Sequence, residues 1–317
     1  MTKWRRARPG VCALMIGIPA SAAAMTAGHA LAAPAPQPIQ ITPRPQHIPY
    51  GHELTVTGSE SLADAGDTVE LEFAAPGATS WQQLSSTTVG GGGLFRLTAV
   101  PERSGVVRAV DASRGSLTAF VAGSGAAATG VTSSPVTVDV EAAVRVRARK
   151  IGVLTGQAVR IRGRLLPAVA GRKVSLQARE SGAWRTLATA RTGSAGRFVL
   201  RYVTGSTGQA PVRVRFAGDR QNGRVAVRAG EMTVYREAGA SWYNDGGNTA
   251  CGFHAYYGVA NRTLACGTKV SFRYNGRSVT ATVDDRGPYV GGRDWDLNQN
   301  TAAALGFGGV GTVWSSQ

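Results

Sequence analysis

Short runs in which apolar and polar residues alternate dominate the middle of the chain. Alternation with a period of two places successive side chains on opposite faces, so each run predicts an antiparallel strand with one buried face. Several such strands within about 90 residues are typical of an immunoglobulin-like β-sandwich. The clearest runs are Val159-Arg160-Ile161-Arg162, Val174-Ser175-Leu176-Gln177-Ala178, Phe198-Val199-Leu200-Arg201-Tyr202 and Val212-Arg213-Val214-Arg215-Phe216.

One spaced set of glycine, apolar and aromatic residues occurs twice along the chain. The first set is Gly51, Gly58, Gly66, Val69, Leu71, Trp81 and Phe95, and the second is Gly156, Gly163, Gly171, Val174, Leu176, Trp184 and Phe198. A period near 100 residues indicates two copies of a whole domain rather than the unit of a repeat array. Because no cysteine pair links the sheets, we expect Trp184 and Phe198 to anchor the core of the second copy.

The pattern as a whole predicts an all-β chain with three folded domains. We expect a first β-sandwich at 37–122, a second at 136–236 and a C-terminal barrel at 238–317. Residues 123–135 lie between the sandwiches, begin with small residues and lack periodicity, so they are expected to form a linker.

The third region has its own strand and turn signals. Residues 269–274 and 278–283 alternate, and Asn275-Gly276 between them favours a two-residue hairpin. Residues 300–306 are expected to form one or two helical turns, with Asn300 as the N-cap and Gly306 as the stop. A last strand at 312–314 would help to close the barrel, which would remove exposed edges.

Residues 1–33 have the features of a secretory signal peptide. An apolar stretch at 11–24 follows the basic residues, and Ala30-Leu31-Ala32 provides a cleavage site. The stretch is short and contains Pro19, which argues against a stable membrane span, although a retained anchor is the alternative. We therefore expect a secreted protein. The basic residues are Lys3, Arg5, Arg6 and Arg8.

The positive charge of the chain is concentrated in the second copy. Residues 141–236 hold 20 Arg and Lys against 4 Asp and Glu, an excess that equals the net charge of the whole chain, +16. Such a field attracts polyanions. For an exported protein, anionic wall polymers or an anionic membrane surface are more plausible partners than nucleic acid, which we do not expect to bind. An arginine-rich strand face that only maintains solubility explains the charge equally well.

Cys251 and Cys266 are the two cysteines that remain beyond the signal segment. Export to an oxidising compartment favours a disulfide between them. Two cysteines without a CxxC spacing cannot supply four zinc ligands, so we expect neither a metal nor another cofactor.

Acidic, basic and aromatic residues gather near the C-terminus, at 284–289 and 292–297. Carboxylates beside an arginine at the Gly287-Pro288 turn are typical of a polysaccharide-cleaving site. A solvated turn with a surface ion pair is an equally good interpretation of the same residues.

An ordered series of short motifs gives this region a family resemblance. The series resembles the rare lipoprotein A-like (RlpA-like) family of peptidoglycan lytic transglycosylases, a six-stranded double-psi β-barrel fold that expansins share. The resemblance covers residues 238–317. Its motifs are Ala240-Ser241-Trp242-Tyr243, Thr249-Ala250-Cys251-Gly252, Ala260-Asn261-Arg262-Thr263-Leu264, Cys266-Gly267-Thr268-Lys269-Val270, Asn275-Gly276-Arg277, Asp285-Arg286-Gly287-Pro288-Tyr289 and Asp296-Leu297.

The resemblance assigns roles to three candidate catalytic positions. It implies that Asp285 is the catalytic acid and that Asp296 lines the glycan groove. It also places a histidine where this chain has Asn261, which cannot exchange a proton near neutral pH. His254 could replace that histidine, or it could be an ordinary loop residue. If the strand extends to Asp284, we expect Asp285 in the groove and Asp284 outside it.

Candidate substrate contacts surround these positions. Aromatic faces stack on sugars, whereas short polar and charged side chains bind hydroxyls. The candidates are Trp242, Tyr243, Thr249, Arg286, Tyr289 and Trp295. For each aromatic residue, the barrel core is the alternative place.

These observations predict a wall protein that binds peptidoglycan glycan strands and cleaves them as a lytic transglycosylase. The basic second sandwich would hold anionic wall polymer. The alternative is a non-catalytic, expansin-like barrel that binds or loosens glycan, in which Asn261 marks the lost activity.

Overall fold

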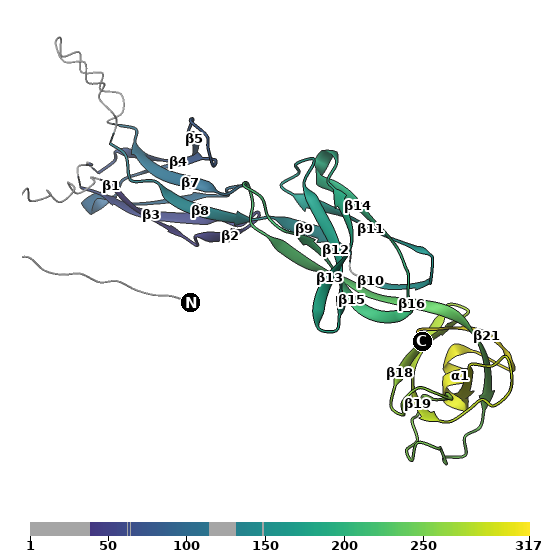
Figure 1. Cartoon of the computed structure of the whole chain (residues 1–317). Coiled ribbons are helices and arrows are strands. Elements are labelled where there is room, and N and C mark those ends of the chain that lie inside the picture. Colours follow the sequence, from purple (N-terminus) through teal and green to yellow (C-terminus); the bar gives the residue numbers. More distant parts are fainter. Residues whose placement is uncertain (1–38, 62, 64, 114–130, 148) are drawn as a thin grey trace, which may run out of the picture. The chain divides into compact units, whose positions relative to one another are not determined.

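A computed structural model describes residues 39–61, 63, 65–113, 131–147 and 149–317 (Figure 1). The expected signal peptide at 1–33 and residues 123–130 of the expected linker lie outside this range. The described elements are strands, except for one short α-helix and two 3-10 turns, η1 (Gly91–Gly93) and η2 (Ser194–Gly196). The expectation of an all-β chain is therefore confirmed.

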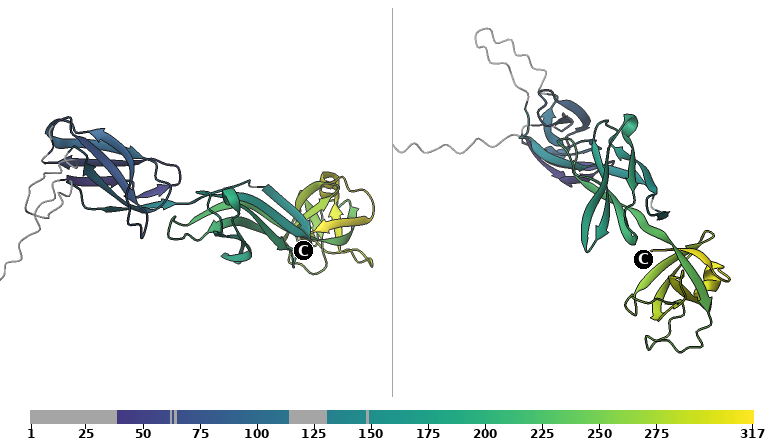
Figure 2. Two further views of the ribbon diagram at one scale, coloured as in Figure 1. Left: turned by 90° about the horizontal axis from the view of Figure 1, so that it is seen from above. Right: turned by 45° about the vertical axis from the view of Figure 1, so that its right-hand side comes forward.

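The first copy consists of two sheets around one core (Figures 1 and 2). Three strands pair in the order β1-β3-β6 and five in the order β2-β8-β7-β4-β5. Alternate side chains from both sheets are buried together, as the period of two requires. The strands are β1 (Ile39–Arg44), β2 (His47–Pro49), β3 (Leu54–Glu60), β4 (Thr68–Ala74), β5 (Gln82–Thr88), β6 (Leu94–Ala99), β7 (Gly105–Asp111) and β8 (Val136–Glu141).

The second copy repeats these pairings strand for strand. Its three-stranded sheet has the order β9-β11-β14. In the other sheet the strands pair in the order β13-β12-β15-β16-β10. The four predicted runs at 159–162, 174–178, 198–202 and 212–216 lie in β11, β12, β14 and β15. The strands are β9 (Ala143–Val146), β10 (Arg149–Leu154), β11 (Ala158–Leu166), β12 (Lys173–Glu180), β13 (Ala183–Arg191), β14 (Arg197–Val203), β15 (Gly208–Phe216) and β16 (Val225–Tyr243).

One expected core residue lies outside the core. Phe198 is buried, as expected, but Trp184 is only half-buried and the guanidinium of Arg213 stacks over its ring at 4.0 Å. Trp81 and Arg108 form the same pair in the first copy, at 4.1 Å. The repeated tryptophan therefore reflects a cation–π contact on the outer side of the sheet rather than core packing.

The repeated glycine on the strand next to the phenylalanine has a packing reason. Gly163 pairs with Phe198 across β11 and β14, and Gly58 pairs with Phe95 across β3 and β6. A Cβ at either glycine would collide with the phenylalanine ring. The two positions need glycine because the ring occupies the space of a side chain.

Gly163→Ala is accordingly expected to destabilise the second copy by about 1–3 kcal/mol, the usual cost of overpacking. Hydrogen exchange should show loss of protection in β11 and β14. Gly205→Ala is the matched control, because a Cβ there meets no atom within 4 Å. Equal protection in the two variants would contradict the packing explanation.

The C-terminal region forms a closed ring of strands. β16, β20, β17, β19, β18 and β21 pair in this order, and β21 pairs back to β16. Buried apolar side chains fill the ring, and Phe272 packs edge-on against Trp295 at 5.1 Å. The strands after β16 are β17 (Gly258–Ala260), β18 (Lys269–Tyr274), β19 (Arg277–Asp285), β20 (Trp295–Asn298) and β21 (Gly311–Ser315).

Local predictions in this region are confirmed except for one cap. Asn275 and Gly276 have positive φ and join β18 to β19 as a hairpin. Helix α1 (Gln299–Leu305) ends at Gly306 in the left-handed conformation, but its N-cap is Asn298 rather than Asn300. The Asn298 side chain accepts from the Thr301 N–H at 2.9 Å. No helix in the described part of the chain is long and apolar enough to cross a membrane.

Candidate functional site

Asp285 stands at the end of β19 with both carboxylate oxygens hydrogen-bonded. The Tyr243 hydroxyl donates to Oδ2 at 3.0 Å, and the backbone N–H groups of Ala250 and Arg286 donate to Oδ1 at 2.8 Å each. The side chain is half-buried, so it is fixed in direction while part of it stays accessible. Strands β16 and β19 and the loop at Ala250 together position this carboxylate.

Asp296 lies on β20, two strands away from Asp285. Ala260 of β17 is the register partner of both aspartates, so it lies between them. The Ser241 hydroxyl donates to Asp296 Oδ1 at 2.7 Å. Ser241 and Tyr243 are two residues apart on β16, and each orients one aspartate, which places both carboxylates on the same face. Ser241 was not among the predicted site residues, although its alternation with Tyr243 could have indicated it.

The spacing of the two aspartates limits the chemistry that they can share. Neighbouring strands are about 4.8 Å apart, so Cα atoms two strands apart are separated by about 9–10 Å. A retaining hydrolase needs carboxyl groups about 5–5.5 Å apart for nucleophile and acid. A Cα separation of that size does not match a retaining pair, whereas an inverting pair, with carboxyl groups about 6.5–9.5 Å apart, is compatible with it.

Tyr243 acts as a fixed donor to Asp285. Burial and the neighbouring Asp285 carboxylate raise the pKa of Tyr243, so its hydroxyl remains protonated. Because the hydroxyl points at Asp285, its first contribution is to orient that carboxylate. This role differs from the direct contact with substrate expected for Tyr243.

Asp284 is fully buried and faces away from Asp285, in the direction expected for a residue outside the groove. Its carboxylate accepts from the N–H groups of Ala255 at 2.8 Å and Val259 at 3.1 Å. Adjacent residues of a strand point to opposite sides, so Asp284 faces this loop while Asp285 faces Tyr243. Burial raises the pKa of Asp284, although the two N–H groups oppose that shift. Its contacts are those of a structural residue.

His254 pairs with Asp245 rather than with Asp285. The His254 Nε2 lies 2.7 Å from Asp245 Oδ2, which also accepts from the Asn298 side chain. Burial opposes ionisation of Asp245, but hydrogen bonds from Asn298, Gln299 and His254 outweigh it and hold the pKa of Asp245 below its usual value. The pair braces the loop before β17, and Asp245 was not predicted because no motif of the series contains it.

Asn261 uses its side chain to hold its own turn. Its amide oxygen accepts from the N–H groups of Thr263 at 3.1 Å and Leu264 at 2.9 Å, and its amide nitrogen donates to the Asp294 carbonyl at 3.2 Å. Its backbone N–H donates to the Asp285 carbonyl at 3.2 Å. Asn261 thus lies beside Asp285 through the main chain, while its side chain has a structural task.

The predicted aromatic contacts divide into surface and core residues. Trp242 is 45% exposed and Tyr289 is 81% exposed, so both rings can stack on a sugar. Trp295 is 1% exposed and packs in the barrel core. A ring enclosed by core side chains cannot contact a glycan, so the expected role of Trp295 is corrected to core packing.

Thr249 and Arg286 lie close to Asp285 but bond to the main chain. The Thr249 hydroxyl donates to the Phe253 carbonyl. The Arg286 guanidinium donates to the Asn261 carbonyl at 3.2 Å and lies 3.0 Å from the sulfur of Cys266. Arg286 therefore does not form a side-chain ion pair with Asp285. Groups of His, Cys, Asp and Glu that could hold a metal ion are absent from the described residues.

The predicted disulfide between Cys251 and Cys266 is present. It fixes the loop whose Ala250 N–H donates to Asp285, and the Cys251 N–H donates to the Asp284 carbonyl at 3.1 Å. The cysteines are 15 residues apart, so the chain-entropy model gives about 3 kcal/mol of stabilisation.

Reduction of this disulfide is expected to lower the free energy of unfolding of the C-terminal region by about 3 kcal/mol. Denaturant unfolding with and without reductant measures the effect, and the Cys251→Ser/Cys266→Ser double variant should reproduce it. If the double variant is as stable as the oxidised protein, the loop is held by its other contacts.

Comparison with known proteins assigns the C-terminal region. Residues 235–314 match the family model described as lytic transglycolase. A protein named "Probable endolytic peptidoglycan transglycosylase RlpA" from Synechocystis sp. is 40% identical over 105 residues, which covers 29% of this chain and 33% of that protein. A protein of the same name from Aquifex aeolicus is 42% identical over 95 residues, with 26% of this chain and 42% of that protein covered.

These matches confirm that the C-terminal region is RlpA-like. The chain spans less than half of the length of either curated relative. Among solved structures, the D0-D1 domain of Intimin matches at 14% sequence identity, and the match covers 59% of this chain and 96% of that chain. Its TM-score of 0.22 is too low to support an argument.

Proposed function

We propose that this chain is an exported wall protein whose C-terminal barrel binds peptidoglycan glycan strands and cleaves them by lytic transglycosylation. The observation that carries the proposal is the position of Asp285, half-buried, oriented on both oxygens and two strands from Asp296. The matched family model and both relatives support the same chemistry at the family level.

In the proposed reaction, Asp285 acts first as acid and then as base. Its proton passes to the glycosidic oxygen as the bond from that oxygen to the anomeric carbon breaks. The C6 hydroxyl of the same sugar attacks the anomeric carbon, and its proton returns to Asp285. The products are an anhydro sugar and a free hydroxyl on the leaving sugar, so neither water nor a second carboxylate nucleophile is consumed.

The other site residues would bind and orient the glycan. Asp296 would accept hydrogen bonds from sugar hydroxyls two strands from the reacting bond. Trp242 and Tyr289 are exposed enough to stack on sugar rings, while Tyr243 fixes Asp285. Asn261, Thr249 and Arg286 would act through the main chain around Asp285.

The N-terminal part would serve as wall-binding modules. We propose immunoglobulin-like sandwiches at 37–122 and 136–236 and a six-stranded double-psi barrel at 238–317. The repeated strand order and the two separate apolar cores support the first two domains. The excess of 16 positive charges in residues 141–236 supports a role in holding anionic wall polymer outside the cytoplasm.

A non-catalytic, expansin-like barrel is the second candidate. The observation in its favour is Asn261, which stands where the family has a histidine and whose amide is used in its own turn. Such a barrel would bind glycan through the same surface without releasing products.

Incubation of the purified protein with peptidoglycan, followed by sedimentation and mass spectrometry, separates the two candidates. Soluble anhydro-muropeptides would establish cleavage. Sedimentation with the wall without such products would support the expansin-like alternative. On peptidoglycan stripped of anionic polymer, loss of sedimentation by a variant that lacks exposed Trp242 and Tyr289 would place glycan on the barrel, whereas unchanged sedimentation would contradict glycan binding by these two rings.

A further inference from the structure

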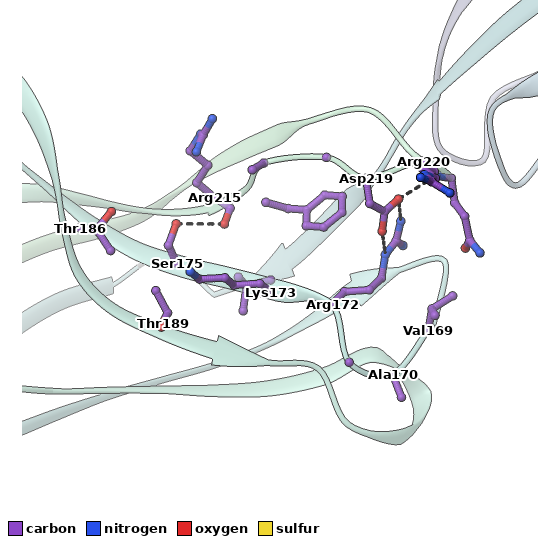
Figure 3. Close-up of a pocket in the computed structure, with 16 residues that line it drawn as sticks. Val169, Ala170, Arg172, Lys173, Ser175, Thr186, Thr189, Arg215, Asp219 and Arg220 are labelled. Atoms are coloured by element: carbon purple, nitrogen blue, oxygen red, sulfur yellow. Dashed lines mark hydrogen bonds and ion pairs between the residues drawn. The ribbon is translucent and has the colours of Figure 1, made fainter. Parts of the chain in front are cut away.

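The outer face of the β13-β12-β15 sheet in the second copy carries an open cleft of about 790 Å³ (Figure 3). Its walls are residues 169–175 and 215–221, with Thr186 and Thr189 on a third side. All these residues belong to the second copy, and none of them is among the site residues of the barrel. No part of the proposed reaction uses this cleft.

One end of the cleft is closed by a buried ion pair. Arg172, 6% exposed, donates through Nε to Asp219 Oδ2 at 2.8 Å and through Nη2 to Oδ1 at 2.9 Å. Figure 3 shows this pair at the opposite end from Ser175 and Thr189. Because Asp219 compensates its charge, Arg172 supports the wall of the cleft rather than offering a free cation.

Three other cations of the cleft have no acidic partner. Among the described residues, no carboxylate forms an ion pair with Lys173, Arg215 or Arg220. Lys173 and Arg220 are exposed, and Arg215 is half-buried. Lys173 and Arg215 produce a local positive field at one concave surface, while Arg220 also lines a second pocket that contains Asp139 and Glu141.

Hydroxyl groups lie in register with these cations. Ser175 of β12 pairs with Thr189 on one side and Arg215 on the other. Two residues along, Gln177 pairs with Thr186 and Arg213. The rows are about 6.8 Å apart, so two threonine hydroxyls on β13 and two guanidinium groups on β15 flank β12 on the same face of the sheet.

The first copy is an internal reference for this face, since the same register pairs its strands. Glu70 and Glu72 occupy the places of Ser175 and Gln177, while Thr68 and Val110 occupy those of Lys173 and Arg215. The second copy therefore lacks two carboxylates and has two additional cations on an otherwise matching framework. A need for general solubility does not explain why the change falls on these facing positions.

Arg108 and Arg213, which occupy the same register position in the two copies, show the electrostatic consequence. Arg108 forms an ion pair with Glu72 at 2.8 Å, whereas Arg213 donates to the neutral amide oxygen of Gln177 at 2.9 Å. Burial and the neighbouring Arg215 lower the pKa of Arg213. The geometry of the arginine is retained while its counter-charge is removed, so an external anion would relieve the repulsion.

We propose that this cleft binds the phosphate groups of a phosphodiester-linked wall polymer through Lys173, Arg215 and Arg220, assisted by the hydroxyls of Thr186 and Thr189. Guanidinium forks match phosphate oxygens, an ammonium supplies a point charge and hydroxyls complete the donor set. The identification of the polymer as wall material rests on the proposed export and function, but the anion site itself does not.

The test uses the purified full chain and poly(glycerol phosphate) in a titration at about 0.1 M salt, where screening still permits charge contacts. The triple variant Lys173→Gln/Arg215→Gln/Arg220→Gln is expected to raise Kd at least about tenfold, since each exposed contact contributes modestly. The matched control is Arg160→Gln/Arg162→Gln/Arg201→Gln, which removes the same charge from exposed positions on the other sheet. It should raise Kd less than about threefold.

Three results would overturn the site. Equal weakening by the two triple variants would mean that only net charge matters. Equally tight binding of polygalacturonate, a carboxylate polymer, would remove the preference for phosphate. Binding of single-stranded DNA more than about tenfold tighter than poly(glycerol phosphate) would assign the surface to nucleic acid. Peptidoglycan digestion measured on the same variants tests the barrel separately, because the cleft lies in another domain.

Discussion

Replacement of Asp285 by Asn is expected to reduce the release of anhydro-muropeptides from purified peptidoglycan by at least about a hundredfold. General acid–base catalysis by one positioned group contributes about 10²–10⁴ in rate, and an amide can neither give nor take the proton. The substitution preserves size, and the remaining carbonyl oxygen can still accept from the N–H groups of Ala250 and Arg286, which donate to the same oxygen of Asp285, while the Tyr243 hydroxyl loses its acceptor. Sedimentation with the wall should therefore be retained, so the loss would appear in product release alone.

Two further variants make this result specific. Tyr243→Phe removes one donor to Asp285 while the bonds from Ala250 and Arg286 remain, so a smaller loss, about tenfold, is expected. Asp294→Asn changes another half-exposed barrel carboxylate, one paired with Arg236, and should stay within about twofold. If Asp285→Asn and Asp294→Asn release equal amounts of product, Asp285 is not the acid.

Strand and turn positions could be read from the sequence because they depend on local rules. The hairpin at Asn275-Gly276 follows from the positive φ that its turn requires, and the alternating runs follow from the two faces of a strand. The repeat of Gly163 and Phe198 was visible without its reason, which is the close approach of the ring to the glycine backbone. Local patterns thus located the elements and the repeat correctly.

The environment of individual side chains depended on contacts between distant segments, which no local rule contains. Trp295 stands between Asp294 and Asp296 in the sequence, yet its ring packs in the barrel core. Asn261 replaces a residue that the family resemblance makes catalytic, but its amide is committed to Thr263 and Leu264. His254 is paired with Asp245, a residue outside the quoted motifs. Tertiary contacts therefore decided which of the candidates face a substrate.

Loss of the Asp284 carboxylate is expected to destabilise the barrel. Asp284→Ala removes the acceptor of the Ala255 and Val259 N–H groups and leaves a cavity beneath Gly258, so it should lower the free energy of unfolding of the barrel by about 2–4 kcal/mol. Denaturant unfolding measures this loss, and hydrogen exchange should show reduced protection in β17 and β19. Asp294→Ala, which removes a half-exposed carboxylate, should cost about 1 kcal/mol or less.

The pH dependence of Asp284→Asn distinguishes burial of the carboxyl group from loss of its hydrogen bonds. Burial raises the pKa of Asp284, so the folded protein binds its proton more tightly than the unfolded chain. That contribution to stability is fully present below the unfolded pKa, about 3.9, and is lost as pH rises through the folded value. The asparagine cannot titrate, and the wild-type protein should therefore exceed this variant in stability by more at pH 3.5 than at pH 7. A difference that is constant with pH, or larger at pH 7, would show that Asp284 is buried as a fully compensated carboxylate, and the hydrogen bonds alone would then explain its place in the barrel.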